Sequence, residues 1–227
     1  MNIVCEHILQ DLIKRHPMLA VCRNALVETF EVIRHSFEAG GKLLICGNGG
    51  SAADAGHIAG ELMKGFHLSR PLPGHLSKVL LSDWGEEGRA LASALQQGLP
   101  VVDLCQSSAL LTAVANDNDP ALIFAQQVMA LGCQGDVLLA LSTSGNARNV
   151  LKAVKVARSL GLDTICLTGE QGGLIAQVAE IAIKAPEQQT HLVQELHLPL
   201  YHALCAMLEE YFFGSLQQAN TGEREGQ

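Results

Sequence analysis

Hydrophobic positions along this chain follow two different spacings. Residues 1–40 hold apolar positions at helical spacing in two stretches, which are broken near Pro17 and end at Gly40 and Gly41. Beyond them, the short apolar runs KLLIC, LPVVDLC, DVLLALS and DTICLTG alternate with turn residues and helix-spaced segments. Near-continuous apolar strands that alternate with helices are typical of a parallel sheet covered on both faces. The pattern predicts an α/β fold, a doubly wound parallel sheet flanked by helices.

Three regions are expected. Residues 1–40 form a helical extension that packs on the core or on a partner subunit, residues 41–213 form one α/β domain, and the polar residues 214–227 form a disordered tail. Within the domain, residues 67–100 are interpreted as a loop or arm followed by a helix, and GGLIAQVAEIAIKAP as one helix. Residues 190–213 are expected to form a long amphipathic helix in spite of Pro199.

Composition narrows the possible functions. The 227 residues are 48% hydrophobic, which suits one large domain or a compact domain with an extension. A net charge of -8 and 4% aromatic residues leave no footprint for nucleic acid. The charged N-terminal segment and the lack of a long apolar run exclude a signal peptide and a membrane span, so a cytoplasmic location is expected. The seven cysteines show no Cys-x-x-Cys spacing and are expected to be reduced packing residues.

The segment CGNGGSAADAGH places glycines and Ser51 between a predicted strand and a predicted helix. Backbone N–H groups of such a loop can approach an anion, with the helix dipole behind them. The same letters fit the dinucleotide pattern through Gly47, Gly49 and Ala52, but the acidic residue that should follow about 20 positions on is missing. An anion site is preferred, and a purely structural turn is the remaining alternative.

A second strand-to-helix junction, LSTSGNARNV, carries three neighbouring hydroxyl groups on Ser142, Thr143 and Ser144, followed by Gly145. Hydroxyls in this arrangement suit phosphate oxygens. The alternative is an ordinary helix cap, since Ser and Thr are favoured there. Two such loops in one sheet favour a phosphate site.

His57 and Glu61 lie four residues apart on the first of these helices, so they share one face. Such a pair can bind a metal or share a proton, whereas a structural histidine beside a solvated glutamate is the alternative.

The C-terminal helix carries Gln194, Glu195, His197 and His202 among apolar residues. Gln194 and His202 are separated by about 12 Å of helical rise, so a straight helix would hardly bring both to one metal. Gln194 would have to precede the first turn, the helix would have to deform near Pro199, or different subunits would have to supply the two ligands.

The blocks CGNGGSAADAGHIAGEL, AVANDND, GDVLLALSTSGNARNV, LTGEQGG and QELHLPLYH occur in this order. In these blocks residues 20–213 resemble the sugar isomerase (SIS) domain proteins, and among them the phosphoheptose isomerases, which convert sedoheptulose 7-phosphate into an aldoheptose phosphate. The resemblance implies the SIS-type, flavodoxin-like sheet. It also implies an enediol proton transfer that yields D-glycero-D-manno-heptose 7-phosphate.

The resemblance assigns roles to individual positions. It implies a homotetramer with active sites shared between subunits, a zinc cofactor, Glu61 as the base and His202 as the acid. The zinc ligands fall on His57, Glu61, Gln194 and His202. The substrate-binding positions, besides Glu61 and Gln194, are Asn48, Gly49, Gly50, Ser51, Asn116, Asp117, Ser142, Thr143 and Ser144.

Three departures from the family pattern concern the substrate. Ala147 replaces a phosphate-loop serine, His191 stands where an acidic residue is expected, and residues 67–108 form a much longer connection than the family's. An isomerase of another sugar phosphate is therefore an alternative. A non-catalytic sugar-phosphate-binding protein or replication-initiation regulator of this family is another, although the set of His57, Glu61 and His202 favours an enzyme.

Overall fold

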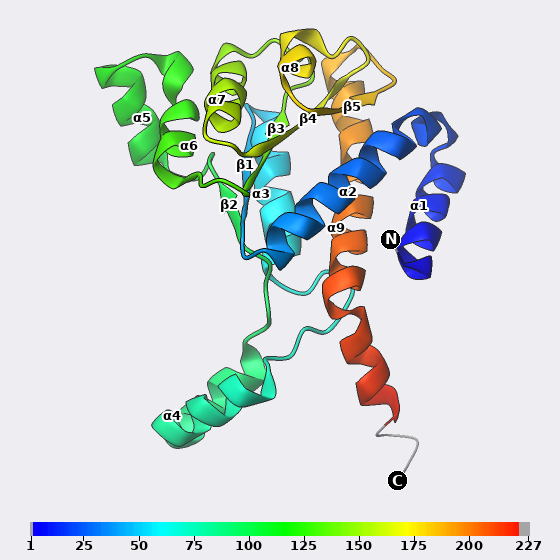
Figure 1. The fold of residues 1–227 in the computed structure, drawn as a ribbon, viewed down its shortest axis with the longest axis vertical. Coiled ribbons are helices and arrows are strands. Elements are labelled where there is room, and N and C mark those ends of the chain that lie inside the picture. Colours follow the sequence, from blue (N-terminus) through cyan, green and yellow to red (C-terminus); the bar gives the residue numbers. More distant parts are fainter. Residues whose placement is uncertain (1, 223–227) are drawn as a thin grey trace.

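The computed structural model describes residues 2–222, with side chains described as far as residue 215. Its sheet contains β1 (Leu43–Cys46), β2 (Val101–Asp103), β3 (Val137–Leu141), β4 (Asp163–Gly169) and β5 (Ile181–Ala185) (Figure 1). All neighbouring strands are parallel, in the order β2-β1-β3-β4-β5. This is the flavodoxin-like order, whose switch point lies between β1 and β3. The predicted doubly wound parallel sheet is confirmed.

Helices cover both faces of the sheet. Leu43 and Ile45 contact the side that carries α1 (Ile3–Arg15), η1 (Pro17–Cys22), α2 (Arg23–Glu38), α3 (Gly50–Met63) and α9 (Thr190–Gly222). Leu44 and Cys46 contact the other side, which carries α6 (Ala125–Leu131), α7 (Arg148–Ser159) and α8 (Gly173–Val178). Because successive side chains of a strand point to opposite faces, β1 and β3, in the middle of the sheet, are buried at every position, as their continuous apolar runs predict. The helices α5 (Ser108–Asp117) and η2 (Pro120–Leu122) connect β2 to α6.

The segment after β4 differs from the expected single helix. It holds the six-residue α8, which ends at Val178, and then β5, which extends the sheet beside β4. The error has a local cause, because IAIKA is too short to show whether its spacing is that of a helix or a strand. Pairing with β4 supplies the backbone hydrogen bonds that select the strand.

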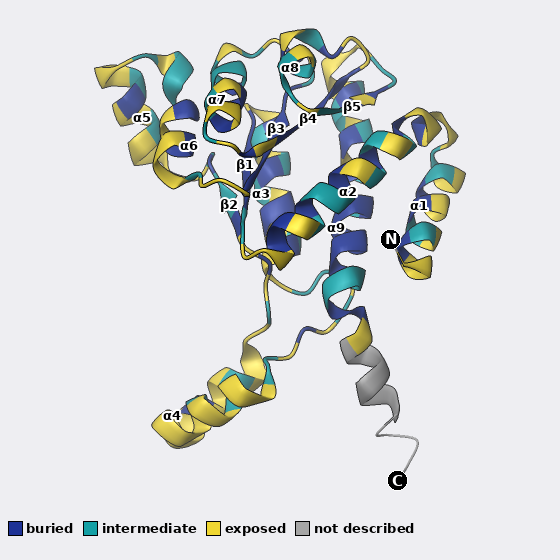
Figure 2. Cartoon of the chain, in the orientation of Figure 1, coloured by how far each residue is buried: buried dark blue, intermediate teal, exposed yellow. Residues whose placement is uncertain are grey.

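The helix α9 is more buried than an amphipathic helix would be. From Leu200 to Glu209 every residue except His202 is buried, since α1, α2, α3 and the sheet surround this stretch (Figure 2). The helix continues through Pro199, which removes one backbone hydrogen bond. It also passes the predicted end at residue 213 and reaches Gly222, and the last part of the predicted tail, residues 223–227, lies outside the described residues.

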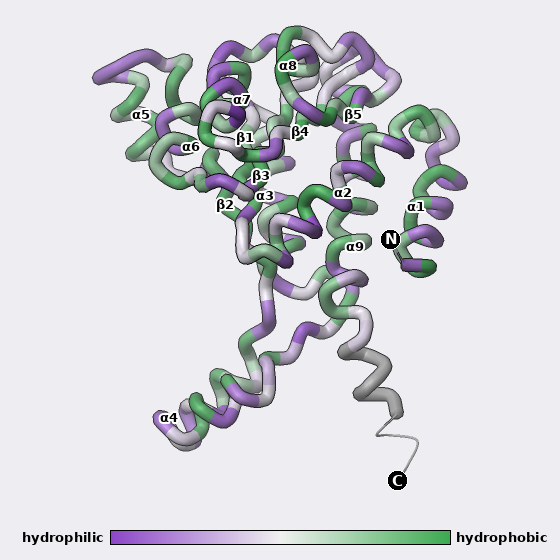
Figure 3. Tube along the Cα trace, viewed as in Figure 1, coloured by the Kyte–Doolittle hydropathy of each residue, from purple (hydrophilic) through white to green (hydrophobic). Residues whose placement is uncertain are grey.

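The arm predicted after α3 is a projecting helical hairpin, α4 (Gly74–Ala94), which stands away from the rest of the chain (Figure 1). Its two halves meet at Gly85, whose φ of 56° suits glycine, and their backbones approach closely at Gly88 and Leu80. Apolar segments are nevertheless visible along this hairpin (Figure 3), and Trp84 is among its exposed side chains. The arm is thus an addition to the sheet domain that buries little of its own apolar surface.

The cysteines are unpaired, as predicted. All seven are free thiols, and five of them are buried; Cys105 is half-buried and Cys133 is exposed. Burial in an apolar environment raises the pKa of the Cys5 thiol to about 11, as expected for an inert packing residue. Within residues 2–222, no helix combines the length and the apolar character that crossing a bilayer requires.

Candidate active site

A pocket of about 360 Å³ lies where the loops after β1 and β3 meet. This is the switch point of the sheet, where ligands bind in folds of this kind. The lining residues come from both loops and from the start of α9: Asn48, Gly49, Gly50, Ser51, Leu141, Ser142, Thr143, Ser144, Ala147, Thr190 and Gln194. The two predicted phosphate loops and Gln194 therefore surround one pocket.

The chemistry of this pocket suits an anion bound by neutral donors. Its lining offers serine and threonine hydroxyls, side-chain amides and no lysine or arginine. The helices α3 and α7 begin at Gly50 and Arg148, and neither is capped by a side chain of the residue before it. Helix starts place the positive end of the dipole beside the pocket. A phosphate group would be held by hydrogen bonds and these dipoles rather than by an ion pair.

Close contacts at two glycines and one pair of amides shape the two loops. The side-chain amide of Gln194 lies directly against Gly50, in the space that a larger residue's side chain would occupy. Gly145 has a φ of 64°, and a side chain there would collide with the carbonyl oxygen of Gly172. The side-chain amides of Asn48 and Asn149 exchange two hydrogen bonds of 2.9 and 2.8 Å, which join the β1 loop to α7.

His57, Glu61 and His202 meet beside this pocket, further along α3 and α9. The His57 Nε2 atom lies 3.2 Å from Glu61 Oε1 and 3.4 Å from His202 Nε2. The His57 side chain is 42% exposed and that of Glu61 is 16% exposed, so both remain accessible. His202 also lines a second pocket of about 410 Å³ between α1, α9 and the loop after α3. The structure thus brings together Glu61 and His202, which were predicted as base and acid, with His57, which was predicted as a metal ligand.

The same three side chains are candidate ligands for a metal ion. As they stand, no three His, Cys, Asp or Glu side chains among residues 2–222 form a ready-made metal site. However, ligands at about 2.0–2.1 Å from a tetrahedral zinc ion lie about 3.3 Å apart, close to the two distances measured at His57 Nε2. Imidazole and carboxylate donors also suit zinc. The donor types and these two distances therefore suit zinc, although the three side chains are not arranged as a complete metal site.

Two histidines of α9, His202 and His197, lie in different environments. Burial, followed by the neighbouring His57, lowers the pKa of His202, which favours a neutral imidazole. A neutral ring can bind a metal or act as an electrophile toward a carbonyl group. His197, by contrast, is fully buried beneath β4, with Nε2 3.2 Å from the Thr168 carbonyl oxygen, and takes no part in the site.

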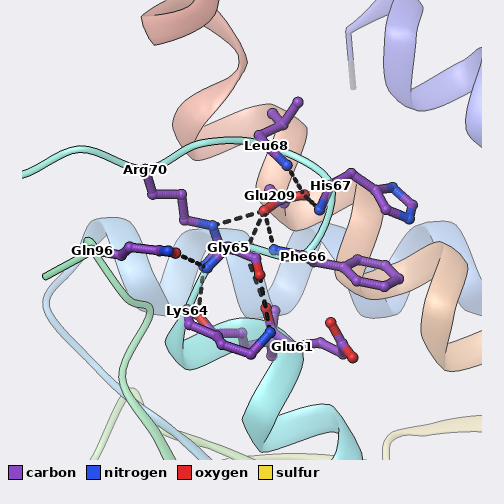
Figure 4. Close-up of polar contacts among 10 residues, drawn as sticks. Glu61, Lys64, Gly65, Phe66, His67, Leu68, Arg70, Gln96 and Glu209 are labelled. Atoms are coloured by element: carbon purple, nitrogen blue, oxygen red, sulfur yellow. Dashed lines mark hydrogen bonds and ion pairs between the residues drawn. The ribbon is translucent and has the colours of Figure 1, made fainter. Parts of the chain in front are cut away.

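A buried ion pair holds the end of α3, which carries Glu61 (Figure 4). The Arg70 guanidinium donates to the carbonyl oxygens of Glu61 and Leu62 at 3.0 and 2.7 Å and to Glu209 at 2.8 Å. Glu209 also accepts the backbone N–H groups of the loop at residues 66–68. Arg70 and Glu209 are 0% and 1% exposed, so this pair joins α9 to α3 in a dry environment. Sequence reasoning missed it, because an isolated arginine before a proline carries no signal of a partner 139 residues away.

Some predicted substrate residues lie elsewhere. Asn116 and Asp117 end α5, where the Asn116 amide donates to the Asp117 carboxylate at 2.8 Å, and neither lines the phosphate pocket. Their role in substrate binding remains a prediction. Conversely, Thr190 lines the pocket without having been predicted, although its place at the start of α9 was a usable signal.

Comparison with known proteins agrees with this geometry. Residues 17–97 and 109–209 match two models of the SIS domain. The phosphoheptose isomerase of Rhodospirillum rubrum is 42% identical over 192 residues, which cover 85% of this chain and 88% of that protein. That of Synechocystis is 38% identical over 208 residues, covering 92% of this chain and 93% of the relative.

Solved structures show the same likeness. The phosphoheptose isomerase from Neisseria gonorrhoeae superposes with a TM-score of 0.69 at 31% identity, covering 91% of this chain and 97% of that one. The phosphoheptose isomerase from Francisella tularensis gives 0.68 at 30% identity, with 82% and 86% covered. The family-model matches and these relatives agree with the loops and the strand order: the chain belongs to the SIS-domain family and is similar to the phosphoheptose isomerases within it.

Proposed function

We propose that this protein is an aldose-ketose isomerase that converts sedoheptulose 7-phosphate into D-glycero-D-manno-heptose 7-phosphate. One observation carries the proposal: a pocket suited to phosphate lies beside a cluster of His57, Glu61 and His202. The names of the similar proteins support the substrate.

The phosphate group would occupy the pocket between the β1 and β3 loops. The Ser51, Ser142, Thr143 and Ser144 side chains would donate to its oxygens. From Ser51 to His57 the helix rises by about 9 Å, so a sugar chain anchored by its phosphate can extend along α3 toward the cluster. Binding energy from the remote phosphate would position the reacting carbons.

Isomerisation requires removal of a weakly acidic proton next to a carbonyl group, with stabilisation of the enediolate that develops. We assign Glu61 as the base that transfers the proton between C1 and C2, and His202 as the acid that protonates the oxygen. The contact of both groups with His57 supports this assignment. The ion pair of Arg70 and Glu209 would keep the end of α3 rigid during the reaction.

We propose zinc as the cofactor, held by His57, Glu61 and His202, with Gln194 as the fourth ligand. Because Glu61 cannot be a tight metal ligand and a free base at once, its contact with the metal would loosen during turnover. When bound, zinc would act as a Lewis acid on the carbonyl oxygen. Gln194 lies against Gly50 at the phosphate loop. We therefore also propose a homotetramer with shared active sites, because a second subunit could supply a ligand from another direction. Seven free thiols support a cytoplasmic location.

The test is to incubate the zinc-loaded protein with a panel of ketose phosphates in deuterated water, following aldose formation and carbon-bound deuterium. Sedoheptulose 7-phosphate should be converted and labelled. Glu61→Gln should abolish both signals and still bind phosphate, whereas Glu28→Gln, on the exposed face of α2, should retain activity.

Two outcomes would oppose this function. Conversion of a different ketose phosphate would mean that the substrate is another sugar, and activity retained by Glu61→Gln would refute the assigned base. Phosphate binding without exchange on any ketose phosphate would instead indicate a non-catalytic sugar-phosphate-binding protein.

A further inference from the structure

The Tyr201 hydroxyl group lies between Asp54 and His57. It donates to Asp54 Oδ1 at 3.2 Å, and its oxygen lies 2.9 Å from His57 Nδ1. Tyr201 is only 2% exposed, and its ring packs edge-on against the His57 ring with centroids 5.5 Å apart. The hydroxyl is therefore held at one place between two polar side chains.

Counting protons assigns the direction of these two hydrogen bonds. A tyrosine hydroxyl carries one proton, and a carboxylate can only accept. Since the Tyr201 proton is donated to Asp54, the hydroxyl oxygen must accept from His57, which requires a proton on Nδ1. In the neutral ring, the lone pair is then on Nε2.

The nitrogen that carries this lone pair faces the other two residues of the cluster, Glu61 and His202. His57 Nε2 is the atom within 3.2 Å of Glu61 Oε1 and 3.4 Å of His202 Nε2. A bare Nε2 lone pair beside a carboxylate oxygen is unfavourable unless a cation or a proton lies between them. The Asp54 and Tyr201 pair therefore prepares this cluster to receive a positive charge.

The geometry points to Tyr201 and Asp54 as positioning residues, which fix His57 as the tautomer protonated on Nδ1 and aim its Nε2 lone pair at the space shared with Glu61 and His202. The tautomer stands independently of the reaction, whereas its use in metal binding rests on the proposed function. Partners of this kind, which orient a ligand through its second nitrogen, typically change metal affinity by about 10–100-fold when removed.

The tautomer can be observed directly with ¹⁵N-labelled histidine, because protonated and unprotonated ring nitrogens differ widely in NMR chemical shift. The metal-free protein is measured at about pH 8.5, where imidazole rings as a class are neutral, and a His57→Gln variant assigns the signal. We expect His57 to be protonated on Nδ1. Asp54→Ala should move the proton to Nε2, because the freed Tyr201 hydroxyl can then donate to Nδ1 while Nε2–H donates to Glu61. Asp54→Asn, whose amide oxygen can still accept, should restore the original tautomer.

Zinc affinity, measured by competition with a chromophoric chelator in the absence of substrate, gives the second readout. Tyr201→Phe should weaken zinc binding by about 10–100-fold. Tyr211→Phe is the matched control, because the other tyrosine of the chain lies about 15 Å further along α9, donates to Glu38 at 2.6 Å, and should leave the affinity unchanged when replaced.

The inference is overturned if wild-type His57 is protonated on Nε2, if Asp54→Ala leaves the tautomer unchanged, or if Tyr201→Phe binds zinc like the wild type. The proposed isomerase activity can fail on its own. In that case the wild-type protein would show no deuterium exchange on any ketose phosphate, while its His57 tautomer would still be as expected.

Discussion

His197 is a fully buried histidine whose pKa makes the stability of the fold depend on pH. It lies on α9 with Nε2 bonded to the Thr168 carbonyl oxygen, while its buried Nδ1 atom has no hydrogen-bond partner. Burial lowers its pKa from the ordinary 6.5 to about 4, although the bond to Thr168 acts in the opposite direction. The folded chain therefore keeps this ring neutral at pH values where the unfolded chain protonates it.

The size of the effect follows from these two pKa values. Below pH 6.5 the unfolded state binds a proton that the folded state does not bind until about pH 4. The free energy of unfolding therefore falls as the pH falls through this window, by about 1.4 kcal/mol for each pH unit, or about 3 kcal/mol in all. Above pH 6.5 the ring is neutral in both states, so the stability that is lost at lower pH is fully present.

Urea unfolding followed by circular dichroism, at several pH values between about 4 and 7.5, measures this loss. His197→Gln keeps an amide donor for the Thr168 carbonyl and removes the titration. The difference between wild type and variant cancels the other titrating groups, and it should change by about 3 kcal/mol across the window. Leu200→Met, a buried substitution on the same helix, should shift stability by a constant amount. A difference between wild type and His197→Gln that does not vary with pH would refute the reasoning.

Two further substitutions test the buried ion pair and the second phosphate loop. Glu209→Ala should cost about 3–5 kcal/mol of unfolding free energy, because Arg70 stays buried without a counter-charge; a loss below about 1 kcal/mol in urea unfolding would contradict this. Strain at a positive φ alone costs about 1–3 kcal/mol. Gly145→Ala should lower the free energy of unfolding by more than that and weaken phosphate binding, because the new side chain also collides with Gly172. Gly40→Ala, with a φ of 81° and open space around it, isolates the strain alone, so equal losses in the two variants would exclude the collision.

Much of the fold follows from local sequence. Continuous apolar runs predicted four of the strands, because a strand buried on both faces must be apolar at every position. The two loops that line the pocket were predictable for a similar reason, since each lies in one contiguous segment between a strand and a helix. His57 and Glu61 share a helix face by spacing alone. Only the short β5 was missed, where local spacing was ambiguous and pairing with β4 decided the outcome.

The candidate site depends on contacts that spacing cannot express. His202 reaches His57 across 145 positions, Tyr201 lies 147 positions from Asp54, and Arg70 meets Glu209 across 139. These pairs form because α9 packs against α3 and because a buried charge or hydroxyl must find a partner.

The sequence alone therefore determined the α/β architecture, the two glycine- and serine-rich loops of the pocket and the His57 and Glu61 face, all of which depend on neighbours within a few residues. The tertiary structure decided which distant side chain completes each of these features. Packing of α9 against α3 brought His202 beside His57, buried His197 away from it, and set the Tyr201 hydroxyl behind His57. The physical reason is that helix periodicity determines which face a residue occupies, whereas burial and hydrogen bonding across the core determine what that face meets.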